Sequence, residues 1–434
     1  MTPIEIGILS VVFIVALVYF GLYVPIALIS VSFVSIWLMR DNLDLSFNLL
    51  KIAISDSVME YAFATIPLFT FMGLVVSKAG LGADIYDVMY RAFRRVSGGI
   101  GMATVGANAV FAAVTGSSIA SASVFTKVSV PQMLRFNYNP RFAVGVVAGS
   151  SVLGMIIPPS AMLIIYSFVA EQSVGEMFIA GIIPGILLAG AYIVAIFLMA
   201  RLRPSMIGGD RTEPTDPLRP GQLFMKTAPV VGLIVIVLGG IYTGVFTPVE
   251  AGAAGSLAAL LIALLRRRLT VRTFAEALIE TGQVSAAILF LITAASIYSR
   301  MLGLAGLPNE MAEILQGSHL GFFGMMVIYV MLMLFLGTLI DTASIILIVV
   351  PLFLPLVEPL GMSPVWFGIV TVVGAEIGLL TPPLGLSCFA IKATLDDQRI
   401  SLKDVFLGSL PFAFIMLLVL VALIRFPELS LALL

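Results

Sequence analysis

The residues of this chain best suited to do chemistry are polar groups enclosed in long apolar runs. Asp341 lies between two strongly apolar segments, 335–340 and 345–350. An aspartate at bilayer depth costs about 2.5–3.5 kcal/mol on insertion scales, so it indicates function by default. Its carboxylate and the hydroxyls of Thr338 and Thr342 are oxygen ligands of the kind that a hard cation such as sodium prefers. The alternatives are an ion pair with a buried base such as Lys127, or a tip that reaches water.

A second polar cluster interrupts an apolar run in the first half of the chain, at Thr115-Gly-Ser-Ser118. Ser117 and Ser118 follow Gly116 at a tip that can expose backbone carbonyls to an ion. Helix–helix packing is the competing interpretation, because Gly and Ser are common where membrane helices touch. The matching tip around Asp341 in the second half favours ligand binding.

Two Pro-Pro pairs interrupt further apolar runs. Gly154-Met-Ile-Ile-Pro-Pro159 is echoed 224 residues later by Gly378-Leu-Leu-Thr-Pro-Pro383. Proline lacks the N–H group and clashes with the preceding turn, so each pair breaks a helix. In hydrocarbon, the freed carbonyls are tolerated only where they line a protein cavity. Two matched breaks in two halves point to a transporter's binding site near the bilayer midplane.

Composition places the chain in a membrane. It is 60% hydrophobic and 11% charged, whereas soluble domains carry about 25% charged residues. A net charge of −1 argues against nucleic acid as a partner. The single Cys388 and single His319 exclude an internal disulfide and Cys- or His-rich metal sites. The chain has no Walker A pattern, nucleophile elbow or Ser/His/Asp set, so we expect neither an ATPase nor another enzyme, and no cofactor besides a coupling ion.

The two halves of the chain share an ordered series of landmarks. Gly21-Leu-Tyr-Val-Pro25 matches Gly244-Val-Phe-Thr-Pro248, and the tips, breaks and later Ser…Phe…Pro patterns follow with offsets between 220 and 228. We interpret this series as an internal duplication. Residues 1–200 form the first repeat and residues 227–434 the second, joined by a polar cytoplasmic linker at 201–226.

The basic residues predict opposite orientations for the two repeats. Cytoplasmic loops are enriched in Lys and Arg, and one side can hold 18 of the 23 basic residues. Segment 98–133 has basic flanks at both ends, so we expect a re-entrant hairpin that enters from the cytoplasm. Its counterpart, 320–356, has flanks without Lys or Arg and should enter from outside.

The expected fold is therefore an all-α polytopic membrane protein with two inverted-topology repeats. With spans of about 20 residues, each repeat has about five transmembrane segments, a re-entrant hairpin and a broken helix. The amphipathic segment 81–96 fits an interfacial helix. The further expected elements are scaffold helices in 5–40 and 228–265, and broken helices at 141–171 and 364–391.

Three other charged residues are secondary candidates. Glu376 lies one turn before the second break and either faces a cavity or meets a neighbouring hydroxyl. Glu250 is placed either at a solvated helix N-terminus near Pro248 or in a mechanical role. Lys127 either snorkels to the cytoplasm or neutralises an anion, and we favour snorkelling.

Five ordered motifs resemble the large permease subunit of tripartite ATP-independent periplasmic (TRAP) transporters, over essentially the whole chain. The motifs begin at Phe111, Leu153, Met177, Gly240 and Gly378. Val249 and Thr115 depart from the usual family pattern, where Thr and Ser are expected, without removing an oxygen ligand.

The resemblance implies a multi-pass protein of a bacterial or archaeal cytoplasmic (inner) membrane. Its implied partners are a small four-helix membrane subunit, a periplasmic substrate-binding protein and an organic anion, typically a carboxylate. The paired hairpins and broken helices resemble elevator-type ion transporters, so symport with sodium is expected.

The resemblance also implies two sodium sites. In this sequence, one would lie between the first tip and the first break, and the other between the second tip and the second break. Substrate is expected between the two tips. The binding candidates are Gly116, Ser117, Ser118, Pro158, Pro159, Ser160, Thr338, Asp341, Thr342, Gly378, Thr381 and Pro382, with Thr115 as a secondary candidate. Sodium itself is assigned to Ser117, Ser118, Ser160, Asp341, Thr342 and Thr381.

Three rival functions stay open at this point. A stand-alone sodium/anion symporter would need no binding protein. A channel-like pore subunit would show uptake without sodium dependence. A structural membrane subunit without its own site is disfavoured by the duplicated polar tips.

Overall fold

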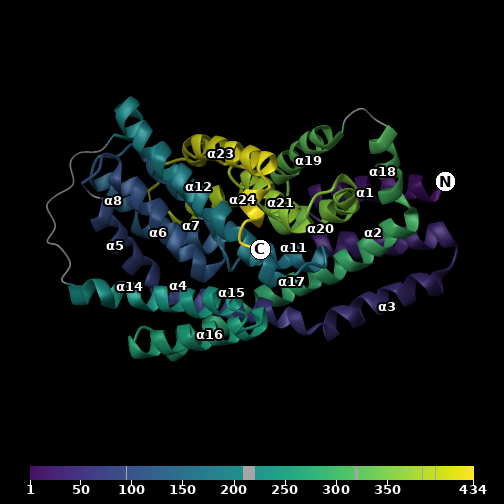
Figure 1. The fold of residues 1–434 in the computed structure, drawn as a ribbon, viewed down its shortest axis with the longest axis horizontal. Coiled ribbons are helices and arrows are strands. Elements are labelled where there is room, and N and C mark those ends of the chain that lie inside the picture. Colours follow the sequence, from purple (N-terminus) through teal and green to yellow (C-terminus); the bar gives the residue numbers. More distant parts are fainter. Residues whose placement is uncertain (94, 209–219, 318–320, 384, 396) are drawn as a thin grey trace.

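The computed structural model describes residues 1–93, 95–208, 220–317, 321–383, 385–395 and 397–434. Within these ranges the fold is helical throughout, and the one isolated β-bridge joins Tyr138 to Gly208. Figure 1 shows an elongated molecule whose helices run mostly along or obliquely to its long axis. The all-α fold expected from the sequence is confirmed.

The helices of the first half begin and end as follows. They are α1 (Pro3–Tyr19), α2 (Val24–Arg40), α3 (Leu43–Met59), the short 3₁₀ helix η1 (Tyr61–Ala64), α4 (Thr65–Lys78), α5 (Leu81–Phe93), α6 (Gly99–Thr115), α7 (Ser118–Val128), α8 (Val130–Arg135), α9 (Pro140–Ser151), α10 (Leu153–Ile156), α11 (Ala161–Val169), α12 (Val174–Leu202) and α13 (Pro204–Ile207).

The second half follows beyond the linker, whose residues 209–219 lie outside the described ranges. Its helices are α14 (Pro220–Ile234), the π-helical turn η2 (Val235–Gly239), α15 (Gly240–Tyr242), α16 (Pro248–Leu265), α17 (Val271–Ala305), α18 (Leu307–Gly317), α19 (Gly321–Gly337), α20 (Thr342–Phe353), the 3₁₀ turns η3 (Leu354–Leu356) and η4 (Glu358–Leu360), α21 (Pro364–Gly378), α22 (Leu386–Thr394), α23 (Leu402–Arg425) and α24 (Glu428–Leu431).

Local sequence explains where the long apolar helices start. Helices α1, α16 and α23 each begin at a capping box, in which a Ser or Thr side chain and an acidic side chain three residues later satisfy each other's backbone amides. In α16 the pair is Thr247 and Glu250, followed by Pro248 at the first helical position. Proline is favoured there because its missing N–H would have had no helical partner.

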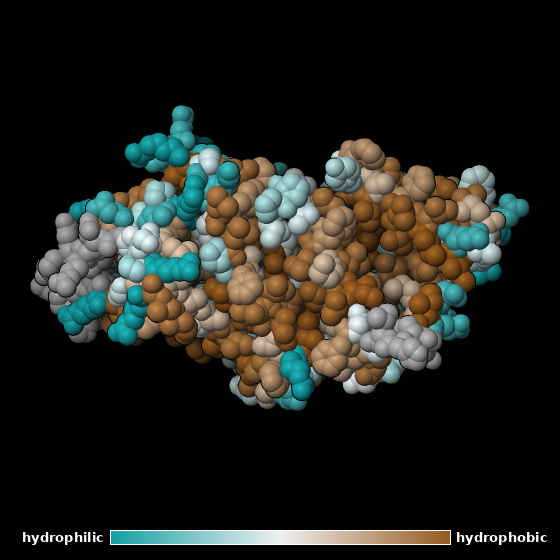
Figure 2. Space-filling model, turned by 90° about the horizontal axis from the view of Figure 1, so that it is seen from above, coloured by the Kyte–Doolittle hydropathy of each residue, from teal (hydrophilic) through white to brown (hydrophobic). Residues whose placement is uncertain are grey.

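The lengths and apolar character of the helices fit a multi-pass membrane protein. Six described helices are long and apolar enough to cross a bilayer, and the bent pair Pro140–Ile156 and Ala161–Val169 adds a seventh candidate. Six further apolar helices have between 10 and 17 residues. Figure 2 shows hydrophobic surface across the middle of the molecule and hydrophilic residues gathered at its two ends.

Two sets of helices differ in what they contact. Helix α2 packs against α1, α3 and α17, and α4 packs against α16 and α17. These helices include the expected scaffold segments 5–40 and 228–265. Among the helices around the tips and breaks, α9 packs against α23 and α19 against α21, while α6 also packs against α4 and α20 against α17.

The two helical pairs around the tips lie on opposite sides of the middle of the molecule (Figure 1). The pair α6–α7 with α8 matches the expected segment 98–133, and the pair α19–α20 matches 320–356, of which residue 320 lies outside the described ranges. Each pair packs against the second arm of the other half's broken helix: α7 against α22, and α20 against α11. This reciprocal packing brings both tips and both breaks into one central region.

Candidate functional site

The first tip is a tight turn pressed against the first break. Gly116 ends α6 with a left-handed backbone (φ 61°), and a Cβ atom there would lie 2.5 Å from the carbonyl oxygen of Pro159. Glycine is therefore required at this position both by its backbone conformation and by space. The amide of Ala161 donates to the Gly116 carbonyl at 3.4 Å. The first tip and the first helix break, which the sequence predicted to be neighbours, are therefore in contact.

Two predicted ligands of this region cap helices. The Ser117 hydroxyl accepts from the amide of Ala120 at 3.3 Å and starts α7. The Ser160 hydroxyl accepts from the amide of Leu163 at 3.4 Å, starts α11 and donates to the Met155 carbonyl. A capping hydroxyl satisfies an amide that the helix leaves unpaired.

Neighbouring hydroxyls at the first tip are more enclosed. Thr115 bonds back to the Phe111 carbonyl at 2.9 Å. The Ser118 hydroxyl is buried and has no hydrogen-bond partner among the described residues. A buried hydroxyl without a partner costs about 1–3 kcal/mol, and the Ser121 hydroxyl on the same helix shares this condition.

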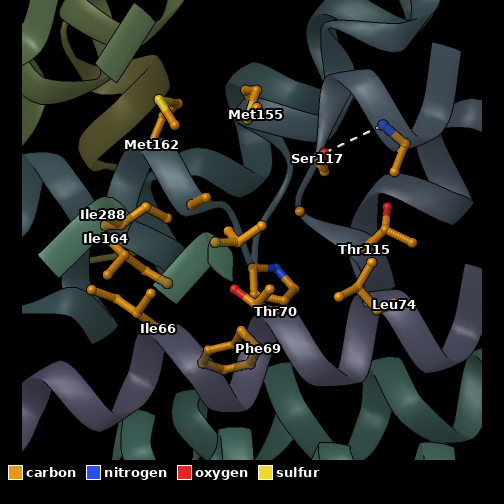
Figure 3. Close-up of a pocket in the computed structure, with 16 residues that line it drawn as sticks. Ile66, Phe69, Thr70, Leu74, Thr115, Ser117, Met155, Met162, Ile164 and Ile288 are labelled. Carbon is orange, nitrogen blue, oxygen red and sulfur yellow. Dashed lines mark hydrogen bonds between the residues drawn. The ribbon is translucent and has the colours of Figure 1, made fainter. Parts of the chain in front are cut away.

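A cavity of about 200 Å³ opens beside this tip. Figure 3 shows Thr115 and Ser117 on one side of it, with Thr70 and Leu74 of α4 below them and Met155, Met162 and Ile164 across from them. Helix α17 contributes Val284 and Ile288. The cavity therefore lies between the first tip, the first break and two helices outside the hairpins, and no described residue of the second tip lines it.

The second tip is organised by Asp341. This residue caps α20: its carboxylate accepts from the amide of Ser344 at 3.1 Å and from the Ser344 hydroxyl. No ion pair joins Asp341 to Lys127, whose exposed side chain lies in the last turn of α7. The ion pair considered as an alternative from the sequence is therefore absent, and snorkelling of Lys127 stays a prediction.

Glu376 contacts the second tip directly. Its side chain is fully buried, and the hydroxyl of Thr342 donates to its Oε1 atom at 3.0 Å. Beside this pair, α19 and α21 cross closely, because a Cβ atom on Gly378 would lie 2.3 Å from the Cα atom of Gly337. The neighbouring hydroxyl anticipated for Glu376 is thus Thr342.

The other predicted hydroxyls of this half bond to their own backbone. Thr338 donates to the Phe335 carbonyl at 2.8 Å, and Thr381 donates to the Gly378 carbonyl at 3.0 Å. Pro382 is exposed, and no hydrogen bond joins Thr381 to Asp341. The structure therefore places these residues near their own helix ends without bringing them together through side chains.

Four helices start at the tips and breaks: α7, α11, α20 and α22. A helix N-terminus carries about half a positive charge and unpaired amides, and it favours anions. The hydroxyl, carboxylate and carbonyl oxygens at the same places favour cations. Groups suited to cations and to anions therefore occur at the same tips and breaks.

Glu250 lies away from this region. Its Oε2 atom accepts from the amide and the hydroxyl of Thr247 at 2.8 and 2.9 Å, and these bonds form the capping box of α16. Of the two roles considered from the sequence, the structure supports the exposed helix N-terminus.

Charged residues link elements at the end of the molecule that carries α5 (Figure 1). Asp84 of α5 is buried and accepts from Arg266 and Arg268, both at 2.7 Å. At the exposed loop before α23, hydrogen bonds from Arg399 lower the pKa of Asp397 to about 2. Segment 81–96 was expected to form an interfacial helix; its residues 81–93 form α5, and Asp84 on this helix is enclosed by arginines that follow α16.

Sequence reasoning did not single out Ser344, Gly337 or Gly73. Ser344 stands three residues after Asp341, which is the spacing of a capping contact and could have been noticed. Gly73 of α4 lies against the first tip, since a Cβ atom there would be 2.6 Å from the Thr115 carbonyl. Gly337 and Gly73 mark close approaches between distant segments, which a single sequence does not reveal.

The apolar spans, the polar tips and the helix breaks are those of a multi-pass membrane protein built like a transporter. Residues 11–429 match the model of the family described as "Tripartite ATP-independent periplasmic transporter, DctM component". The chain belongs to this family of transporter permeases, which are not enzymes.

Named relatives cover nearly the whole chain. It is 32% identical to the C4-dicarboxylate TRAP transporter large permease protein DctM of Pseudomonas aeruginosa, over 89% of this chain and 90% of that protein. It is 29% identical to the sialic acid TRAP transporter large permease protein SiaM of Vibrio cholerae, over 86% of each.

Two solved structures share the fold. The Neisseria gonorrhoeae MtrF structure covers 98% of this chain and 95% of its own, with a TM-score of 0.63 at 13% identity. The YdaH transporter of Alcanivorax borkumensis covers 90% of each chain with a TM-score of 0.59 at 15% identity. At these identities the likeness shows the fold alone.

Proposed function

We propose that this chain is the large membrane subunit of a sodium-coupled secondary transporter that imports an organic anion. The proposed class of anion is a carboxylate. The observation that carries the proposal is the pair of capped tips packed against two helix breaks. Enclosed oxygens at both tips offer cation ligands, and four helix N-termini offer positive ends to an anion.

A carboxylate fits both the site and the family. Relatives are named for C4-dicarboxylate, sialic acid and 2,3-diketo-L-gulonate transport, and C4-dicarboxylates and sialic acid carry carboxylates. In this chain, sodium at Ser117, Ser118 and Ser160, and at Asp341, Thr342 and Thr381, would place positive charge beside the tips. An anion then binds without a midplane arginine, and sodium and anion favour each other's binding.

The proposed partners are a periplasmic substrate-binding protein and a small membrane subunit. One relative, at 29% identity, is named isethionate TRAP transporter permease protein DctMQ, and this chain covers 57% of it. That protein is substantially longer than this chain, which supports a second membrane component. The helices α1, α2 and α16 of the expected scaffold segments are the proposed contact surface for this component.

The proposed movement is of the elevator type. The tips, the breaks and α9, α12 and α23 pack together and would move as one unit against the helices α1–α4 and α14–α17. The cavity beside the first tip lies on this boundary, because α4 and α17 form one of its walls. Ordering of the tips by sodium would couple ion binding to closure of the substrate site.

The test is uptake of radiolabelled C4-dicarboxylate into proteoliposomes that contain this chain and its small subunit, with and without binding protein and a sodium gradient. We expect uptake only when both are present. Asp341→Ala should abolish sodium-driven uptake while membrane insertion is kept. Asp341→Asn preserves the helix cap, since Asn and Asp cap equally well, and should also lose sodium-driven uptake because it removes the charge.

Each alternative gives a different result. Uptake without binding protein would indicate a stand-alone symporter, and uptake without sodium would indicate a channel-like subunit. If Asp341→Asn transports normally with unchanged sodium dependence, the carboxylate is a helix cap only, and its assignment as a sodium ligand is wrong.

A further inference from the structure

We infer that Glu376 is a positioning residue that aligns the Thr342 hydroxyl for a cation, and that it makes the two tips unequal in sodium affinity. This inference rests on the proposed function, because it assumes that the second tip binds sodium. Glu376 contacts Thr342, the proposed sodium ligand, and is not itself assigned as a ligand.

The geometry starts from one enclosed hydrogen bond. Thr342 and Glu376 are 3% and 0% exposed, and the Thr342 hydroxyl donates to Glu376 Oε1 at 3.0 Å. The two residues come from α20 and α21, so the bond ties the second tip to the helix that precedes the second break. The other carboxyl oxygen, Oε2, is buried and has no partner among the described residues.

A hydroxyl coordinates a cation through its lone pairs, so its proton must point elsewhere. Glu376 Oε1 receives that proton and thereby turns the lone pairs of Thr342 away from α21. Partners behind a metal ligand commonly fix its orientation in this way, and their loss costs roughly 10–100-fold in metal affinity. The role holds whether Glu376 is ionised or neutral, because a carboxylate oxygen and the carbonyl oxygen of a carboxylic acid both accept.

The first tip lacks a carboxylate acceptor at the position that corresponds to Glu376. With the offset of 224 residues, Ser118 corresponds to Thr342 and Val152 corresponds to Glu376. Ser118 and Val152 are both fully buried, and the Ser118 hydroxyl has no partner among the described residues. The duplicated position therefore carries an oriented hydroxyl in one half and an unoriented one in the other.

The test compares Glu376→Val with Glu376→Gln in the reconstituted complex. Valine gives the second tip the apolar residue found in the first. We expect it to raise the sodium concentration for half-maximal thermal stabilisation and half-maximal uptake by roughly 10–100-fold. Glutamine keeps an acceptor oxygen, so its half-maximal sodium concentration should stay close to that of the unmodified protein. If Glu376→Val is not recovered folded, Glu376→Met, which is closer in shape, takes its place.

A matched control comes from the same helix. Thr371 of α21 shares a buried hydrogen bond of 2.6 Å with Tyr329, away from the second tip. Thr371→Val should lower the melting temperature and leave the half-maximal sodium concentration unchanged. This separates loss of a buried hydrogen bond from loss of cation alignment.

The possible failures are distinguishable. If the unmodified protein shows no sodium response, the proposed function itself is wrong. If sodium acts and Asp341→Ala removes its effect, but Glu376→Val leaves sodium affinity unchanged, only the positioning role is wrong. A Glu376→Gln variant as weak as Glu376→Val would also overturn it, because an acceptor alone would then be insufficient.

Discussion

Three proposed sodium ligands have a second role as helix caps. Ser117, Ser160 and Asp341 each accept a backbone amide at the start of a short helix, at 3.3, 3.4 and 3.1 Å. These caps were predictable in kind, because Ser and Asp are favoured immediately before a helix. A neighbouring hydroxyl was one of two placements expected for Glu376, but its identity as Thr342 was not predictable, because the two residues lie 34 positions apart on different helices.

Ser118 gives the sharpest prediction for a single residue. Its buried hydroxyl has no partner among the described residues, which costs about 1–3 kcal/mol. Ser118→Ala should therefore raise the melting temperature in sodium-free buffer and reduce the additional stabilisation that sodium gives. Thermal unfolding measured over a sodium titration checks both signs. Such a gain in stability with a loss of ligand response is expected when a functional site is not optimised for stability.

Ser121 is the control for this prediction. It lies one turn further along α7, and its hydroxyl is equally buried and likewise has no partner in the described part of the chain. Ser121→Ala should raise the melting temperature without changing the response to sodium. Equal sodium responses in Ser118→Ala and Ser121→Ala would remove Ser118 from the proposed site.

The helix breaks and tips were predictable as elements because proline and polar residues interrupt otherwise apolar runs. The broken helix expected at 141–171 corresponds to the bent pair Pro140–Ile156 and Ala161–Val169, and the segment expected at 364–391 contains the separate helices α21 and α22. Which elements pack together was not predictable, since helix pairs such as α19–α21 depend on small residues whose partners lie elsewhere in the sequence. The crossing of Gly337 and Gly378 is one such pair.

A second prediction concerns this crossing. Gly378→Ala places a methyl group 2.3 Å from Gly337 Cα and must separate α19 from α21. Overpacking of this kind costs about 1–3 kcal/mol, so the melting temperature should fall. Gly374→Ala, one turn earlier, meets its nearest side-chain atoms at an ordinary 3.7 Å and should be tolerated. Equal melting temperatures for the two variants would show that the helices do not cross as closely as described.

At the scale of the whole molecule, the arrangement is reciprocal. Each tip packs against the broken helix of the other half, through α7 with α22 and α11 with α20. The proposed duplication and the charge asymmetry could be inferred from the sequence, because both are patterns along the chain. The exchange of partners between the two halves could not be inferred, because it depends on contacts between distant helices. Opposite insertion of the two hairpins remains the prediction on which the inverted topology depends.

Cysteine labelling tests that prediction. Ser97 is exposed at the base of α6, and Ser363 is partly exposed at the start of α21. In a Cys388→Ala background, which removes the single buried native thiol, Ser363→Cys should react with a membrane-impermeant maleimide in spheroplasts. Ser97→Cys should react only after the membrane is permeabilised, because its hairpin has basic cytoplasmic flanks.

Both substitutions replace a hydroxyl by a thiol of similar size, so they disturb the fold little and form a matched pair. Labelling of each denatured variant gives the maximum signal against which accessibility is scored. If both cysteines react from the same side, the two hairpins enter the membrane from that one side and the repeats are parallel. The two tips would then no longer be related by inversion, and the proposed alternation of access between the two sides would lose its structural basis.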